Sequence, residues 1–141
     1  MYNQKKSFNK GDYIYMKPIH TKYSRQNPGH YVPAIKHNDT LYISGQLSID
    51  FETGQPPEGG IKAETKQALY NLDLILNEAN LNRNNIIMCR IYTPDVQYWD
   101  EINQIYSEYF NEHIPARVIV PTTTLHHNCL IEIEAIADYK E

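Results

Sequence analysis

The sequence Pro115-Ala-Arg-Val-Ile-Val-Pro121, followed after a short polar bridge by Cys129-Leu-Ile-Glu-Ile-Glu-Ala-Ile-Ala137, predicts two buried strands. Each strand carries a charge that a buried strand disfavours, Arg117 in the first and Glu132 in the second. Burying either charge unpaired would cost several kcal/mol, so something must compensate it. Two interpretations stay open: a structural ion pair, or a polar or anionic ligand.

The segment before the first helix predicts a pair of strands. Residues 31–35 form a short extended run, and residues 36–39 supply turn residues. Residues 41–49 then alternate apolar and polar side chains, which is the period of a half-buried strand. Gly45 breaks this alternation within the Ser-Gly-Gln sequence at 44–46. A glycine there indicates either a simple β-bulge or a close backbone approach to a ligand.

Two helices and a central strand lie between these segments. An apolar stripe at three- and four-residue spacing predicts a helix that ends at Ala79 and is stopped by Asn80. Residues 86–93 predict a central strand, and a second helix after Pro94 places Trp99 and further aromatic residues on one side. The order β-β-α-β-α-β-β predicts an α+β fold with two helices on one face of a mixed sheet. The uncovered face predicts an oligomer.

Length and composition predict one soluble domain. The 141 residues suit a single core, and we divide them into an N-terminal extension at 1–16 and a domain at 17–141. The formal net charge of −4 argues against a general electrostatic grip on nucleic acid. No apolar run approaches a membrane span or a signal core, so a cytoplasmic location is expected. Cys89 and Cys129 are predicted to be buried, reduced thiols.

Four motifs in order resemble the Rid (reactive intermediate deaminase, formerly YjgF) family. They are Gly29-His-Tyr-Val32, Leu41-Tyr-Ile-Ser-Gly-Gln46, Pro115-Ala-Arg117 and Ile131-Glu-Ile-Glu-Ala-Ile-Ala137. The resemblance implies a chorismate-mutase-like fold and a homotrimer in which three sheets form a central barrel. It also implies clefts between subunits that bind small carboxylates, with no metal or organic cofactor. The implied activity is hydrolysis of 2-imino acids, or their enamine tautomers, to 2-keto acids and ammonia.

The resemblance also implies roles for three catalytic residues. Arg117 matches the arginine that grips the substrate carboxylate, a task for which the planar guanidinium fork is well suited. Glu132 matches the glutamate near the attacking water, where a carboxylate can accept a proton. Tyr31 matches a tyrosine at the cleft edge, contributed by the neighbouring subunit.

Some of the predicted substrate-binding positions match the family pattern, and others differ from it. Ser44 and Gly45 match the segment that lines the cleft. Ile119 stands where the deaminase branch usually carries a cysteine whose backbone carbonyl faces the site, and Pro33 stands where glutamine is frequent. These differences predict a Rid relative outside the best-studied deaminase branch.

His126, His127 and Cys129 raise the question of a metal. Adjacent histidines in an extended segment point to opposite sides, and a structural zinc usually needs four ligands. We therefore predict no metal, and place the two histidines in a loop or at the cleft rim. Two functions remain as alternatives to the deaminase. One is a regulatory trimer that only binds a small carboxylate, and the other is a nucleic-acid-directed role, which the acidic charge disfavours.

Overall fold

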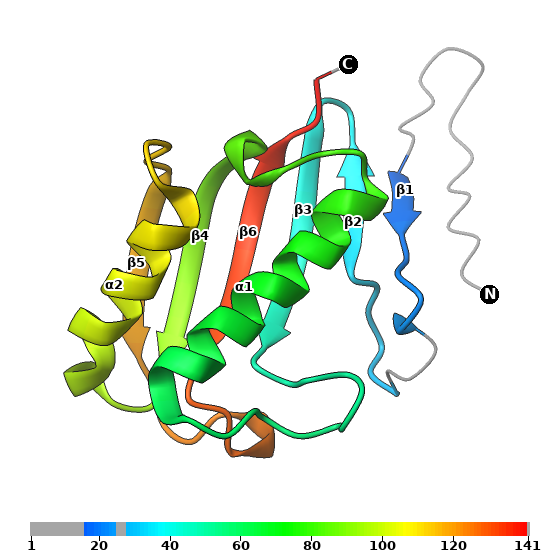
Figure 1. Ribbon diagram of the computed structural model, residues 1–141. Coiled ribbons are helices and arrows are strands. Elements are labelled where there is room, and N and C mark those ends of the chain that lie inside the picture. The colour runs from blue at the N-terminus through cyan, green and yellow to red at the C-terminus, as the bar shows by residue number, and fades with distance from the viewer. Residues whose placement is uncertain (1–15, 25–27, 141) are drawn as a thin grey trace, which may run out of the picture.

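Six strands form one mixed sheet in the computed structural model of the protein, which describes residues 16–24 and 28–140 (Figure 1). The strands are β1 (Met16–Ile19), β2 (Ala34–His37), β3 (Thr40–Leu47), β4 (Ile86–Thr93), β5 (Ala116–Pro121) and β6 (Glu132–Asp138). Their order is β1-β2-β3-β6-β4-β5; β4 and β5 run parallel, and the other neighbours run antiparallel. The last strand, β6, therefore lies inside the sheet between β3 and β4.

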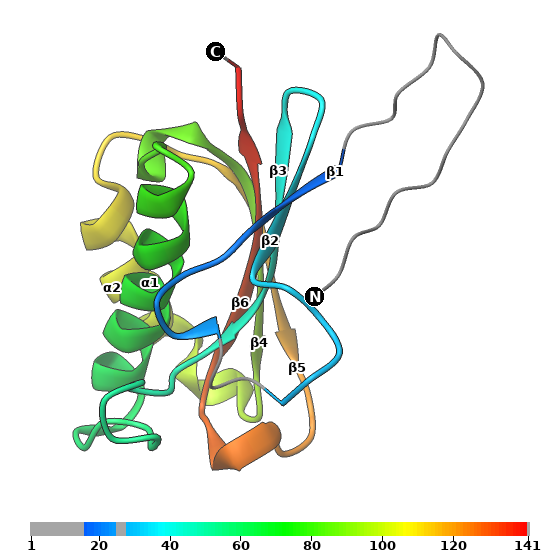
Figure 2. The ribbon, with the colours of Figure 1, turned by 90° about the vertical axis from the view of Figure 1, so that its right-hand side faces the viewer.

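Two helices cover one face of this sheet. They are α1 (Gly60–Glu78), which packs on β3 and β6, and α2 (Trp99–Phe110), which packs beside α1. The larger elements are connected in part by short 3-10 turns, which include η2 (Arg83–Asn85), η3 (Val96–Tyr98) and η4 (His126–Asn128). The edge-on view in Figure 2 shows no helix on the opposite face among the described residues. The predicted α+β arrangement, with both helices on one face, is confirmed.

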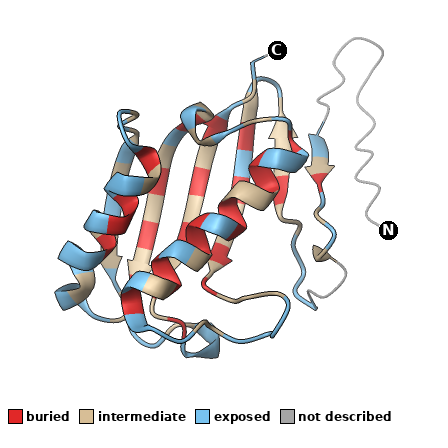
Figure 3. Cartoon of the chain, viewed as in Figure 1, coloured by how far each residue is buried: buried red, intermediate tan, exposed pale blue. Residues whose placement is uncertain are grey.

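The core lies between the helices and the sheet. Leu72 and Leu76 of α1 are fully buried against this layer, as are Ile91 of β4 and Ile133 of β6 (Figure 3). Full burial of one such side chain contributes about 1.5–3 kcal/mol. On the open face, in contrast, Tyr42 of β3 is 49% exposed. One face of the sheet is thus closed within the chain, while the other offers side chains to solvent or to a partner.

The predicted strand pair exists, but its first strand is displaced. It occupies Ala34–His37 rather than 31–35, because only Asn38 and Asp39 connect it to β3, with Asn38 at a left-handed φ of 53°. An earlier strand, β1, has no counterpart in the sequence-based prediction. It has four residues, contains Pro18 and lies at the edge of the sheet, so it carries little periodic signal.

The strand that carries Arg117 differs from its prediction. β5 is not a buried strand: it lies at the sheet edge, pairs with β4 alone and is partly exposed along its length. The apolar sequence misleads because edge and centre depend on topology, which composition does not encode. Edge placement also explains Pro121, since a proline at the end of an edge strand leaves no ladder hydrogen bond unmade.

Several smaller predictions concern the termini and the cysteines. Residues 1–15 lie outside the described residues, and the boundary at 16/17 stays a prediction, although Met16 pairs with His37 in β1. Cys89 and Cys129 are buried free thiols, as expected, and burial raises the pKa of Cys89 to about 11. Within 16–24 and 28–140, no helix has the length and apolar character needed to cross a membrane.

Candidate functional site

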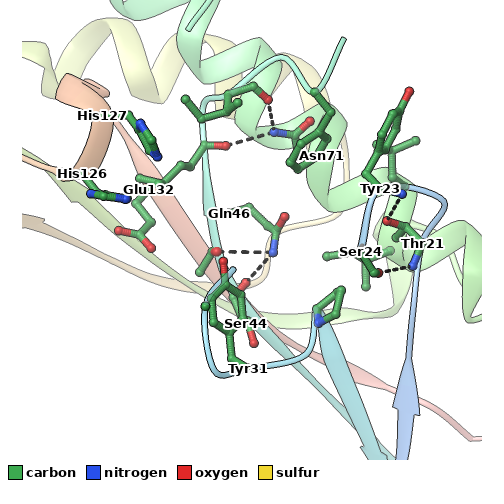
Figure 4. A pocket seen from close by; sticks show the side chains of 18 of the residues that line it. Thr21, Tyr23, Ser24, Tyr31, Ser44, Gln46, Asn71, His126, His127 and Glu132 are labelled. Atoms are coloured by element: carbon green, nitrogen blue, oxygen red, sulfur yellow. Dashed lines mark hydrogen bonds between the residues drawn. The ribbon is translucent and has the colours of Figure 1, made fainter. Parts of the chain in front are cut away.

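A cavity of about 770 Å³ opens between β3, α1, the segment before β2 and the turn before β6 (Figure 4). The residues that line it include Tyr31, Ser44, Gly45, His126, His127 and Glu132. Four of these, the tyrosine, the serine, the glycine and the glutamate, belong to the predicted site. The cavity therefore brings together residues that lie about a hundred positions apart in the sequence.

The β-bulge in β3 shapes the part of the cavity wall that lies beside Glu132. The β3–β6 register shifts between Ile43 and Gln46, which confirms the predicted bulge at Gly45. A Cβ atom on Gly45 would overlap the Oε1 atom of Glu132 and lie 3.1 Å from its Cδ. The group that lies close to the Gly45 backbone is thus the Glu132 side chain, and the approach of a ligand at Gly45 stays a prediction.

Ser44 connects the bulge to the segment that carries Tyr31. Its hydroxyl donates a hydrogen bond to the carbonyl of Val32 at 2.7 Å, and its backbone N–H donates to the carbonyl of Pro33 at 2.9 Å. The Gln46 side chain donates back to the carbonyl of Ser44 at 2.9 Å. These bonds fix the segment that follows Tyr31, a residue that lines the cavity and is 57% exposed.

Glu132 begins β6 and is half-buried at the cavity wall. Burial raises the pKa of its carboxyl, and the negative charge of Glu134 raises the pKa further, while His126 opposes both effects. A carboxyl with a raised pKa is a stronger base than an ordinary surface glutamate. Glu132 therefore has the environment expected of a proton acceptor.

Arg117 lies outside this cavity. It pairs with the buried Cys89 and so points to the helix side of the sheet, where its Nη1 donates to Asn103 Oδ1 at 2.9 Å. Its guanidinium also lies 4.7 Å from the ring centroid of Tyr106 and 5.3 Å from that of Trp99. Among the described residues, the partners of this charge are thus an amide and two aromatic rings rather than a carboxylate.

Arg117 and Glu132 occupy opposite faces of the sheet. Ile133 is buried on the helix side, so its neighbour Glu132 projects to the open side. The structural ion pair between the two charges is therefore not formed within one chain. Ile119 shares the strand and the helix-side face of Arg117, and it also lies outside the cavity.

The two histidines contradict their predicted geometry. His127 adopts a left-handed backbone (φ 58°, ψ 21°) inside the η4 turn, so the segment is not extended. The rings of His126 and His127 consequently lie 4.0 Å apart, centroid to centroid, and both line the cavity. No group of three or more His, Cys, Asp or Glu side chains suited to a metal occurs in the described part of the chain.

Glu64 is a residue near the site that the sequence reasoning overlooks. It is 6% exposed on α1, and its Oε1 accepts hydrogen bonds from the Ser48 hydroxyl at 2.7 Å and the Leu130 N–H at 3.0 Å. The bond to Leu130 fixes the chain just after the histidine turn. A signal is present in the sequence, since Glu64 interrupts the apolar stripe next to Thr65.

Comparison with known proteins shows which family the chain resembles in sequence. Residues 23–139 match the family model described as Endoribonuclease L-PSP. A RutC family protein of Pyrococcus abyssi is 41% identical over 123 residues, covering 87% of this chain and 96% of the relative. The 2-iminobutanoate/2-iminopropanoate deaminase of Mus musculus is 37% identical over 124 residues, covering 88% of this chain and 92% of the relative.

Solved structures show the same fold. The Rid family protein YyfA from Yersinia pestis superposes with a TM-score of 0.83 at 35% identity, covering 88% of this chain and 99% of that one. E. coli TdcF with bound serine gives 0.81 at 28% identity, with coverages of 88% and 99%. The fold and cavity thus define an α+β protein of the YjgF type. The chain belongs to the Rid family.

Proposed function

We propose that this protein hydrolyses reactive 2-imino acids, or their enamine tautomers, to 2-keto acids and ammonia. The main support for this proposal is the environment of Glu132. Its carboxyl group lines a cavity together with Tyr31 and Ser44, and burial raises its pKa. The names of the mouse and human relatives, both 37% identical, support this reaction. The serine bound to TdcF supports a ligand that carries a carboxylate next to a nitrogen-bearing carbon.

The proposed site is completed by a second copy of the chain. Arg117 and the backbone at Ile119 would come from one copy, and Tyr31, Gly45 and Glu132 from its neighbour. Two features support this division: Arg117 and Glu132 lie on opposite sides of one sheet, and the open face exposes apolar side chains that a partner can cover. We propose a homotrimer, the assembly that the family resemblance implies.

In the proposed reaction, Arg117 binds the substrate carboxylate through two parallel charge-assisted hydrogen bonds. A water oxygen bonds to the imine carbon, the π electrons move to nitrogen, and Glu132 accepts the proton that the water loses. Glu132 then passes this proton through water to the nitrogen, which leaves a neutral carbinolamine and an ionised Glu132. The nitrogen then takes up a further proton while Glu132 accepts the hydroxyl proton. The C–N bond breaks with its electron pair on nitrogen, which gives the 2-keto acid and ammonia, and Glu132 afterwards releases the proton it accepted. Tyr31 forms the wall at the cavity mouth, and confinement of the water supplies the remaining acceleration.

A role directed at nucleic acid has less support, although the family description names an endoribonuclease. The chain carries a formal net charge of −4, and the cavity places the Glu132 carboxylate where a phosphate would have to approach. Phosphate recognition depends on clustered lysine and arginine. We therefore favour a small carboxylate as the ligand.

The direct test uses 2-iminobutanoate formed in place by threonine dehydratase acting on threonine. The protein should accelerate loss of the imine and release of 2-ketobutyrate above the rate in buffer alone. Calorimetry with 2-ketobutyrate measures binding independently of turnover. Binding without any acceleration would replace the deaminase by the alternative, a regulatory protein that holds a small carboxylate.

A further inference from the structure

The turn that carries His126 and His127 is fixed on two sides. Leu130 donates its N–H to Glu64 of α1 at 3.0 Å, and its carbonyl accepts from the Thr93 hydroxyl of β4 at 2.8 Å. Cys129, between the turn and these bonds, is 1% exposed. The histidines therefore project from a short segment with buried anchors, which gives their rings a defined position at the cavity wall.

Both rings face the same cavity as the Glu132 carboxylate (Figure 4). The imidazole of His126 interacts electrostatically with Glu132, and it packs on His127 at 4.0 Å. Among the described residues, the titratable or charged groups around Glu132 are Glu134 on β6, Tyr92 and Arg90 on β4, His126, His127 and Cys129 in and after the turn, and Tyr31 before β2. His126 is the member of this set that opposes the effects of burial and of Glu134 on Glu132.

The proposed reaction requires a proton donor as well as a proton acceptor, and Glu132 cannot serve as both at the same time. After water has added, one proton must leave the carbinolamine hydroxyl while another reaches the nitrogen, since an amide ion is not a viable leaving group. Imidazole is the side chain whose ordinary titration range lies near neutral pH, so it can give and take protons there.

We propose that His126 is the proton donor to the departing ammonia, acting beside Glu132 as the acceptor. This inference rests on the proposed function. In the step, the imidazolium of His126 gives its proton to the amino nitrogen, and Glu132 accepts the hydroxyl proton. The C–N bond breaks with its electron pair on nitrogen, the C=O bond forms, and ammonia leaves. The proton on Glu132 then returns to His126 through water, which restores both groups.

In this step His126 donates a proton while Glu132 accepts one, so the two residues must be in opposite protonation states. Rate should depend on ionised Glu132 and protonated His126 together, which gives a bell-shaped dependence of kcat/KM on pH. The His127 ring contacts the His126 ring at a tilt of 55°, so we expect it to support the position of that ring. Its removal should cost less activity than removal of His126.

The test compares His126→Gln, His127→Gln and a control, His37→Gln, whose side chain lies in β2 and does not line the cavity. His126→Gln should lower kcat/KM for imine hydrolysis by about 10²-fold, the lower range for a general acid. It should also remove the decline of activity at alkaline pH and leave the affinity for 2-ketobutyrate unchanged. The control should match the wild type.

A second measurement does not need turnover. The carboxyl titration of Glu132, followed by ¹³C NMR, should move to higher pH in His126→Gln, because a neighbouring positive charge is lost. His37→Gln should leave that titration in place.

Different failures remain distinguishable. Wild-type kcat/KM with an unchanged pH profile in His126→Gln would overturn the assignment while leaving the deaminase proposal intact. A larger loss in His127→Gln, or an unmoved Glu132 titration, would also overturn it. A wild-type protein that accelerates no imine hydrolysis would refute the deaminase proposal itself, and the donor role with it.

Discussion

Gly45 and Glu132 are in such close contact across the β3–β6 pair that no Cβ atom fits between them. The bulge in β3 brings the backbone of Gly45 against the carboxylate and leaves the cavity as its open side. A Cβ atom at this position would displace the Glu132 carboxylate, so the glycine matters for the space it leaves rather than for a left-handed backbone. The position of the proposed base is set by a residue on another strand.

Replacing this glycine should act through Glu132. In Gly45→Ala the new methyl group forces the carboxylate to move, so imine hydrolysis should fall by about 10²-fold or more, as when a general base is lost. Circular dichroism should show an intact fold. The double variant Gly45→Ala/Glu132→Gln should be no slower than Glu132→Gln, because both changes remove one function. Additive losses would mean that Gly45 acts independently of Glu132.

The pH dependence of hydrolysis should report Glu134. Activity needs ionised Glu132, and its raised pKa moves the acid limb of kcat/KM to higher pH than an ordinary glutamate would give. Glu134→Gln removes the second cause of that shift, so the acid limb should move to lower pH, although burial still holds it above the usual range. Glu108→Gln, on exposed α2 surface, is the control. An upward or absent movement in Glu134→Gln would contradict the charge relation.

Much of the fold follows from patterns that local physics fixes. Asn80 stops α1 with a left-handed φ of 57°, and the N–H of Leu81 returns to the carbonyl of Leu76 at 2.8 Å, as the sequence predicts. The interruption at Gly45 likewise predicts the bulge. In both cases the type of a single residue indicates the local structure, a left-handed backbone at Asn80 and a close approach without a side chain at Gly45.

The misplaced parts of the site depend on information of longer range. The sequence predicts that Arg117 is a charge in a buried strand. In the structure β5 is an edge strand, and Arg117 contacts Asn103 and aromatic rings on α2. The sequence predicts that His126 and His127 lie in an extended segment with their side chains on opposite sides. The left-handed backbone at His127 instead brings the two rings into contact. Neither strand order nor a rare backbone angle at a histidine has a periodic signature.

Assembly can be tested on the open face of the sheet. Val118 of β5 is 40% exposed there, so a charge at this position costs the single chain little but would be buried between copies. Sedimentation should show a trimer for the wild type at micromolar concentration. Val118→Asp should give folded monomers that lack hydrolytic activity. Val96→Asp, at a 59% exposed position in η3, should remain trimeric. A wild-type monomer that hydrolyses imines would refute the shared cleft.

Arg117 provides the test that separates binding from chemistry. Arg117→Ala should lose about 2–5 kcal/mol of affinity for 2-ketobutyrate, the usual result when one partner of a desolvated charge pair is removed. Arg117→Lys should recover little, because an ammonium lacks the planar fork. Asn103→Ala keeps the guanidinium but removes its hydrogen bond, so calorimetry should detect a smaller loss.

Glu132→Gln, in contrast, should bind the keto acid normally while hydrolysis falls by roughly 10²–10⁴-fold. Unchanged affinity in Arg117→Ala would remove Arg117 from the site, and wild-type hydrolysis in Glu132→Gln would assign that glutamate a structural role.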